Sequence, residues 1–237
     1  MTLLVCPTPI GNLEDITLRV LAALRDADVV ACEDTRHTAG LLKRHGIEAK
    51  LVSYHEHNER ARAGELVERM RAGETVALVS DAGMPLVNDP GYDLLQATIA
   101  AGLRVEVLPG PSATITALVA SGLPNDVWRF AGFLPRKAGP LRDVFAAPET
   151  VVAFESPRRV GASLKVLAEL DPARPVAVCR ELTKLHEEIV RGSAAELAAR
   201  YAQQDPRGEI VLVVGGAPEP TGLDPAAVEA VCTLVEA

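Results

Sequence analysis

Charged side chains follow several of the apolar runs that are typical of buried strands. Four segments share this arrangement: Glu33-Asp34-Thr35-Arg36-His37-Thr38, Ser80-Asp81-Ala82-Gly83, Glu155-Ser156-Pro157-Arg158-Arg159 and Arg180-Glu181-Leu182-Thr183-Lys184. The carboxylates of Asp34, Asp81, Glu155 and Glu181 could accept a proton from a reacting group, and the guanidinium groups could hold an anion. Capped helix starts and structural ion pairs explain the same residues equally well. Both interpretations therefore stay open at this point.

The segment that follows the apolar run 75–79 contains two prolines and two glycines within a dozen residues, 80–91. These residues disfavour both helix and sheet, so we expect a stiff loop. An acidic residue in such a loop, at the end of a buried strand, is how open α/β sheets present a group to a small molecule. A strand-to-helix connection in which Asp81 caps a turn is the alternative.

The first half of the chain alternates between strand and helix patterns. Strands are predicted at 3–6, 28–32, 49–53, 75–79 and 104–108, and helices at 17–27, 39–45, 59–72, 92–101 and 113–121. This alternation predicts right-handed crossovers and a mainly parallel sheet with flanking helices. The loops 7–12, 33–38, 54–58, 80–91 and 109–112 should then emerge at one edge of the sheet. We expect a ligand site at that edge.

The second half predicts a smaller α/β domain with a mixed sheet. Strands are expected at 128–133, 151–154, 176–179, 188–190 and 210–214, and helices near 141–146, 160–170 and 194–203. Residues 188–192 follow Cys179 too closely for a helical crossover, which favours antiparallel pairing there. A linker at 122–125 divides the chain into domains 1–121 and 122–237. The helical pattern at 226–236 has no cap, which predicts that the chain is cut short there.

The composition of the 237 residues excludes several classes of protein. Hydrophobic residues make up 48% of the chain, no apolar run is long enough for a membrane span, and the N-terminus lacks a signal-peptide pattern, so we expect a cytoplasmic protein. The four cysteines lie far apart and form no zinc or disulfide pattern. The net charge of −8 argues against binding of nucleic acid by the whole surface. A local basic face remains available from residues 43–45, 136–137, 158–159 and 184.

The familiar phosphate and nucleophile motifs are absent. The chain contains no GxxxxGK[ST] and no GxGxxG after its first strand, which argues against a P-loop enzyme and the usual dinucleotide fold. Ser112 follows Pro109-Gly110-Pro111 without a GxSxG elbow, so it is expected to cap a helix. His55 and His57 would point apart on a strand, and we expect no metal.

The order of these segments resembles one family over almost the whole chain. The runs that resemble the N-terminal half of the tetrapyrrole-methylase superfamily are residues 7–15, 33–36, 80–85 and 109–113. The runs 54–59, 132–137, 154–158 and 180–188 resemble one branch, the bacterial 16S rRNA (cytidine-2′-O)-methyltransferases that act in the decoding centre. Many motifs in the same order make this a specific match.

The resemblance implies S-adenosylmethionine as the methyl donor, a cleft between two α/β domains that holds it, and a homodimer. It implies that the donor pocket is lined by Pro9, Ser80, Asp81, Ala82, Gly83, Pro85, Val87, Ser112, Ala113 and Phe154. The expected catalytic residues are Asp34, Glu155, Arg158 and Glu181. The sequence does not show which of the carboxylates, if any, is the general base. Methyl transfer from a sulfonium needs no metal and depends chiefly on positioning.

The function expected from this resemblance is 2′-O-methylation of a decoding-centre cytidine in 16S rRNA, with the small ribosomal subunit as partner. A methyltransferase of the same fold that acts on a corrin or tetrapyrrole precursor, or on a modified translation factor, is the nearest alternative. A non-catalytic module that binds an adenosine ligand is the alternative from another class.

Overall fold

The computed structural model describes residues 1–203 and 205–218, so the predicted helix 226–236 lies outside the described residues. The chain forms two compact units. The first unit comprises Met1–Thr116 together with Glu181–Glu187, and the second comprises Ala117–Arg180 and the described residues from Glu188 onward. The sequence-based boundary after residue 121 stays a prediction. Within the described part of the chain, no helix has the length and apolar character needed to cross a membrane.

The first unit is built on a five-stranded sheet in which every pair of neighbouring strands is parallel. The strands are β1 (Thr2–Val5), β2 (Val29–Cys32), β3 (Leu51–Ser53), β4 (Thr75–Leu78) and β5 (Arg104–Val107), in the order β3-β2-β4-β1-β5. The helices are η1 (Leu13–Asp15), α1 (Leu18–Asp26), α2 (Thr35–Arg44), α3 (Glu59–Arg71), α4 (Tyr92–Ala100) and the start of α5 (Ala113–Ser121). The predicted parallel sheet is therefore confirmed.

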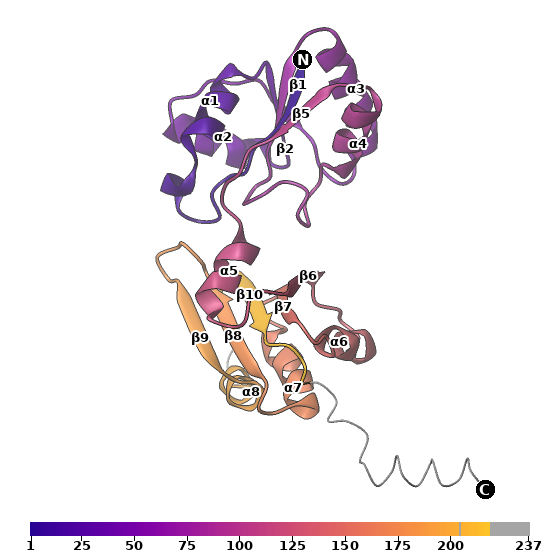
Figure 1. Cartoon of the computed structure of the whole chain (residues 1–237). Helices are drawn as coiled ribbons and strands as arrows, with labels where there is room; N and C mark the ends of the chain where they lie inside the picture. Colours follow the sequence, from indigo (N-terminus) through magenta and orange to yellow (C-terminus); the bar gives the residue numbers. More distant parts are fainter. Residues whose placement is uncertain (204, 219–237) are drawn as a thin grey trace, which may run out of the picture. The chain divides into compact units, whose positions relative to one another are not determined.

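Helices cover both faces of this sheet, which explains why its inner strand β2 is apolar without interruption, whereas the edge strand β5 carries Arg104 and Glu106. Val29 and Ala31 of β2 face the cluster formed with α3 and α4, whereas Val30 and Cys32 face the cluster formed with α1 and α2. Figure 1 shows these two pairs of helices on opposite sides of the strands. Successive residues of a strand point to opposite faces, so a sheet buried on both sides needs apolar residues at every position.

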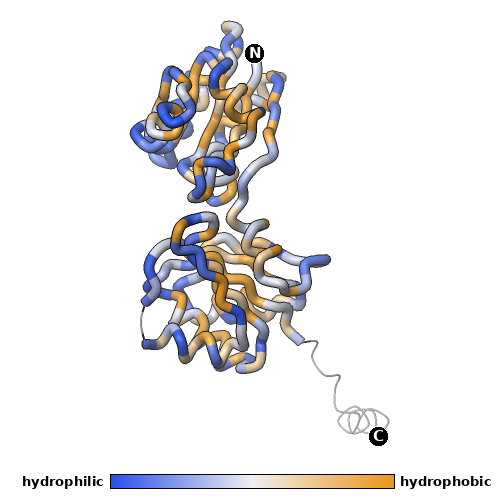
Figure 2. Tube along the Cα trace, turned by 90° about the vertical axis from the view of Figure 1, so that its left-hand side faces the viewer, coloured by the Kyte–Doolittle hydropathy of each residue, from blue (hydrophilic) through white to orange (hydrophobic). Residues whose placement is uncertain are grey.

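The second unit holds a mixed sheet. Its strands are β6 (Trp128–Phe133), β7 (Thr150–Glu155), β8 (Pro175–Arg180), β9 (Glu188–Ser193) and β10 (Ile210–Val214), in the order β6-β7-β10-β8-β9. β6 and β7 are parallel and the other neighbouring pairs are antiparallel, so the predicted antiparallel pairing of the strand at 188 is confirmed. The helices α6 (Ala138–Phe145), α7 (Val160–Leu170) and α8 (Ala194–Tyr201) contribute to one apolar cluster with alternate strand residues. Figure 2 shows hydrophobic residues along the strands of each unit.

Two local expectations differ from the structure. Helix α2 begins at Thr35 rather than at residue 39, because Asp34 caps it: the Asp34 carboxylate accepts a hydrogen bond from the Arg36 amide at 2.8 Å. The loop expected at 33–38 is therefore short. His55 and His57 lie in a turn, not on a strand, and their rings meet edge to face with centroids 5.9 Å apart. The expectation that they point apart applied to a strand, so it does not hold for this turn within the predicted loop 54–58.

Candidate functional site

The loops after β1 and β4 are joined by hydrogen bonds at the carboxyl edge of the first sheet. The Thr8 amide donates to the Gly83 carbonyl at 2.9 Å, and the Gly83 amide donates back to the Thr8 carbonyl at 3.0 Å. The Thr8 hydroxyl donates to the Ser80 carbonyl, and the Ser80 hydroxyl donates to the Gly83 carbonyl. Both side chains are buried, and these bonds satisfy their polar atoms. The two loops therefore form one rigid element.

A third loop meets them at Gly83. Gly83 has a φ of +80°, and a Cβ built there would lie 3.3 Å from Cγ2 of Ile10 and 3.8 Å from the carbonyl oxygen of Pro111. Only glycine adopts this conformation without strain, and the missing side chain lets the three loops pack closely at this buried residue. Leu86 and Asn88, in the same 80–91 loop, have φ values of +71° and +63°. Such strained residues cluster at ligand sites.

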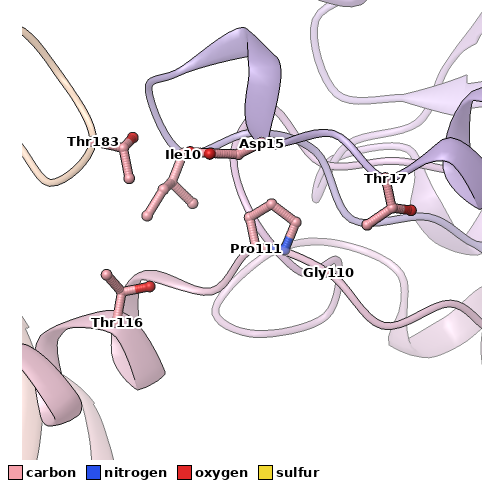
Figure 3. A pocket seen from close by; sticks show the side chains of 7 residues that line it. All are labelled: Ile10, Asp15, Thr17, Gly110, Pro111, Thr116 and Thr183. Atoms are coloured by element: carbon pink, nitrogen blue, oxygen red, sulfur yellow. The ribbon is translucent and has the colours of Figure 1, made fainter.

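A pocket opens beside this junction within the first unit. It is lined by Ile10, Asp15, Thr17, Gly110, Pro111, Thr116 and Thr183. Its volume is about 340 Å³, within the range of ~300–1,000 Å³ that small-molecule sites occupy. Figure 3 shows the Asp15 side chain extending from η1 toward Ile10, with the Pro111 ring beside them. None of these residues was among the predicted site residues, although the loop 109–112 and the run that contains Thr183 had been singled out.

The segment Glu181–Glu187 supplies part of the pocket wall from a distant part of the sequence. The Asn12 amide donates to the Thr183 hydroxyl at 3.0 Å. A Cβ on Gly11 would lie 2.7 Å from that same hydroxyl and 2.5 Å from Cγ of Lys184, so Gly11 permits a close approach of the two segments. Glu181 forms an ion pair with Lys184 at 2.8 Å. The catalytic role predicted for Glu181 stays a prediction.

The carboxylates at the sheet edge differ in acidity because their surroundings differ. Hydrogen bonds from Arg36 lower the pKa of Asp34 to about 2, which makes it a weak base at neutral pH. Burial, together with the neighbouring Glu33 carboxylate, raises the pKa of Asp89 to about 6. Asp81 accepts a hydrogen bond from the Asp34 amide at 3.2 Å. Asp89 thus fits a proton acceptor better than Asp34, and the sequence signal for it was its place in the 80–91 loop.

In the second unit, Glu155 is buried and its oxygens are occupied. It accepts hydrogen bonds from the Ser156 amide at 2.7 Å and from the Ser163 hydroxyl at 2.5 Å, and it forms an ion pair with Arg159 at 3.4 Å. Arg159 also donates to the carbonyls of Leu134 and Pro135, both at 2.9 Å. Glu155 and Arg159 therefore fix the start of α7 and the end of β6. A catalytic role for Glu155 stays a prediction.

Two other predicted residues of the second unit have different surroundings. Arg158 is exposed, and its guanidinium has no hydrogen bond or ion pair to the described part of the chain. Phe154 is half-buried, and its ring contacts those of Phe130 and Phe133 edge to face. The structure thus places most of the predicted donor residues in the first unit and Phe154, Glu155 and Arg158 in the second. That these residues form one site, in a cleft between two domains, stays a prediction.

The remaining predicted donor residues lie close to the junction. Pro9 and Pro85 are buried, Ala82 is exposed, and Val87 lies at an intermediate depth in the 80–91 loop. The Ser112 carbonyl accepts the first hydrogen bonds of α5 from the Thr116 amide and hydroxyl, whereas its hydroxyl pairs with that of Thr114. Ala113 is the first residue of this helix. Within the described residues, no group of three or more His, Cys, Asp or Glu side chains could hold a metal ion.

A parallel sheet with joined loops at its carboxyl edge defines an α/β protein of the class that commonly binds small ligands at that edge. The model of the tetrapyrrole (corrin/porphyrin) methylases matches residues 2–198. The chain belongs to this family.

Within the family, the chain is similar to proteins named ribosomal RNA small subunit methyltransferase I. The relative from Micromonospora olivasterospora is 50% identical over 223 residues, which cover 92% of this chain and 71% of the relative. The relative from Thermotoga maritima is 41% identical over 217 residues, which cover 90% of this chain and 98% of the relative.

Solved structures show the same fold. The crystal structure of uroporphyrin-III-C-methyltransferase from Thermus thermophilus has a TM-score of 0.64 and 26% identity, and the match covers 90% of this chain and 94% of that chain. The cobalt precorrin-4 methyltransferase of cobalamin biosynthesis has a TM-score of 0.64 and 20% identity. The match covers 90% of this chain and 94% of that chain, and at this identity it shows a likeness of fold alone.

Proposed function

We propose that this protein uses S-adenosylmethionine to methylate the 2′-hydroxyl of a cytidine in 16S rRNA. The observation that carries the proposal is the junction of three loops at Gly83, at the carboxyl edge of a parallel sheet. The relatives' name, ribosomal RNA small subunit methyltransferase I, supports methyl transfer to rRNA of the small subunit, and the cytidine 2′-hydroxyl rests on the resemblance described above. Ribosomal RNA is a cytoplasmic substrate in bacteria, so we place the protein in the cytoplasm.

The residues at the junction fit the donor. The buried Gly83 lets the three loops pack closely, and the apolar side chains near it can cover an adenosine or a methionine chain. The carboxylates of Asp81 and Asp89 lie in the same loop and favour a cation, which matches the positive charge of a sulfonium. When bound, the donor supplies a methyl group on sulfur; its transfer to a hydroxyl forms an oxygen–carbon bond, breaks the sulfur–carbon bond and releases one proton.

The chain's own contribution is to position the acceptor and to take that proton. A ribose hydroxyl is a weak nucleophile, so a carboxylate beside it helps the reaction. Asp89 has the pKa suited to this role, about 6, and Asp81 lies in the same loop. The rigid pairing of Thr8 with Gly83 holds this loop in place before any ligand arrives.

RNA binding needs basic side chains, because the chain as a whole carries a charge of −8. Arg158 is exposed and free of partners in the described residues, so it can hold a phosphate. Arg159 is engaged by Glu155 and by two backbone carbonyls, so it serves the fold and not the RNA.

Incubation with labelled S-adenosylmethionine tests the proposal, with small ribosomal subunits and uroporphyrinogen III as alternative acceptors. We expect label in 16S rRNA and 2′-O-methylcytidine in its nuclease digest, identified by mass spectrometry. A methyl group on a base, or label only in the tetrapyrrole, would show that the function is wrong. Donor binding without transfer to either acceptor would favour a regulatory binding module.

We also propose a homodimer, as the family resemblance implies. Light scattering at micromolar concentration should give a mass near twice the 25.1 kDa of the chain. A single species with the mass of one chain would contradict this.

A further inference from the structure

The pocket beside Gly83 offers a distinctive set of hydrogen-bonding groups. The Asp15 carboxylate lies at its rim, exposed, and makes no hydrogen bond or ion pair to the described residues. The Thr183 hydroxyl accepts a hydrogen bond from the Asn12 amide, which leaves its own proton free to be donated. Ionised Asp15 can only accept hydrogen bonds, so the pocket presents an acceptor at Asp15 and a free donor at Thr183. The Thr17 hydroxyl accepts from the Val20 amide and adds a second free donor, and the Thr116 hydroxyl donates to the Ser112 carbonyl and can still accept.

The pocket also offers apolar walls. The side chain of Ile10 is 7% exposed, and the Pro111 ring lies near it (Figure 3). Flat heteroaromatic rings bind between such apolar surfaces, while a few polar groups at the rim fix their orientation. The pocket therefore suits a planar ring that has a hydrogen-bond donor on one part of its edge and an acceptor on another.

We propose that this pocket holds the base of the target cytidine, flipped out of the RNA, with Asp15 accepting a hydrogen bond from its exocyclic amine. The inference rests on the proposed function and names the residue that selects the base. Cytosine carries an amine donor at N4 beside the acceptors N3 and O2, which matches Asp15 and Thr183. Uracil presents a carbonyl oxygen in place of the amine, and two acceptors facing each other repel.

The position of the pocket supports an acceptor site rather than the donor site. Ile10 and Pro111 line the pocket, and both also lie against the position of a Gly83 Cβ, so the pocket shares a wall with the proposed donor loop. Methyl transfer requires donor and acceptor to lie on adjoining surfaces, because the reacting atoms must approach within about 3–3.5 Å. Enzymes that do chemistry on a base extrude it from the stack into a snug pocket, and a cytidine held in this way would present its ribose beside the donor loop.

The test compares Asp15→Asn with the wild type on two substrates, small subunits with the natural cytidine and subunits with uridine at that position. The amide of asparagine can donate to the uracil carbonyl. We therefore expect kcat/KM on the cytidine substrate to fall on the order of 10- to 100-fold, and the preference for cytidine over uridine to shrink by a similar factor. A loss of stability would lower both rates and leave this preference unchanged.

Glu14→Gln is the matched control, because Glu14 is exposed, neighbours Asp15 and does not line the pocket. It should keep the wild-type rate and preference. Calorimetry should give the same S-adenosylmethionine affinity for both variants. An unchanged cytidine preference in Asp15→Asn, or a parallel loss of donor affinity, overturns the inference while leaving the proposed function intact. A wild-type protein that leaves rRNA unmethylated overturns the proposed function, and this inference with it.

Discussion

The Gly83→Val variant is expected to lose about 10- to 100-fold in affinity for S-adenosylmethionine while it remains folded. Valine at a φ of +80° is strained, and its branched side chain would press on Ile10 and on the Pro111 carbonyl. The three loops that meet there would have to separate, and the donor would lose its preformed surface. Isothermal titration calorimetry measures the change directly.

Gly46→Val is the control for Gly83→Val, because it strains the backbone at a glycine that lies outside the proposed donor site. Gly46 follows α2 with a φ of +62°, and a Cβ there would meet nothing within 4 Å. It lies at the end of α2 that precedes β3, away from the carboxyl edge of the sheet. The variant should therefore lose stability and keep its affinity for the donor. Equal affinities in the two variants would show that the donor does not bind at the Gly83 junction.

Arg159→Ala should destabilise the second unit by roughly 3–5 kcal/mol, the usual cost of leaving a buried charge without its partner. Glu155 has no exposed side-chain surface, and Arg159 is its ionic partner at 3.4 Å. The substitution would also leave the carbonyls of Leu134 and Pro135 without a donor. Urea unfolding followed by circular dichroism measures the change, with the second unit's transition moving to lower denaturant.

The neighbouring Arg158→Ala is the matched variant, because the exposed Arg158 guanidinium makes no hydrogen bond or ion pair with the described residues. Its stability should stay within about 0.5 kcal/mol of the wild type. Binding to small subunits should weaken, and the slope of log affinity against log salt should fall by about one. If Arg158→Ala binds RNA as the wild type does, this residue holds no phosphate. If Arg159→Ala is as stable as the wild type, the ion pair with Glu155 contributes little.

The sequence predicted the first sheet because the relevant signals are local. Uninterrupted apolar runs such as 75–79, separated by helical patterns with short connections, permit little other than a parallel sheet. The carboxyl edge, and with it the loops that carry Thr8, Gly83 and Pro111, followed from that topology. The antiparallel strand at 188 could be predicted because the connection before it is too short for a crossover.

The features that the sequence did not predict depend on contacts between residues far apart in the sequence. Arg158 and Arg159 are identical in type and adjacent, yet one is exposed and the other is held by carbonyls from residues 134 and 135. The pKa of Asp89 depends on burial and on Glu33, neither of which a local pattern reveals. Likewise, nothing in the sequence predicts that Thr183 lies against Asn12 and lines the same pocket as Ile10.

The return of Glu181–Glu187 to the first unit has a consequence for the order of events during protein synthesis. The ribosome makes residues 1–116 first, but the wall that contains Thr183 appears only after all of 117–180 has been translated. At about 5–20 residues per second, this is a delay of several seconds. Throughout that interval the nascent sheet can form, while the Asn12 amide still lacks its acceptor. The pocket that Thr183 lines is therefore assembled late, and a chain that stalls before residue 183 cannot complete it.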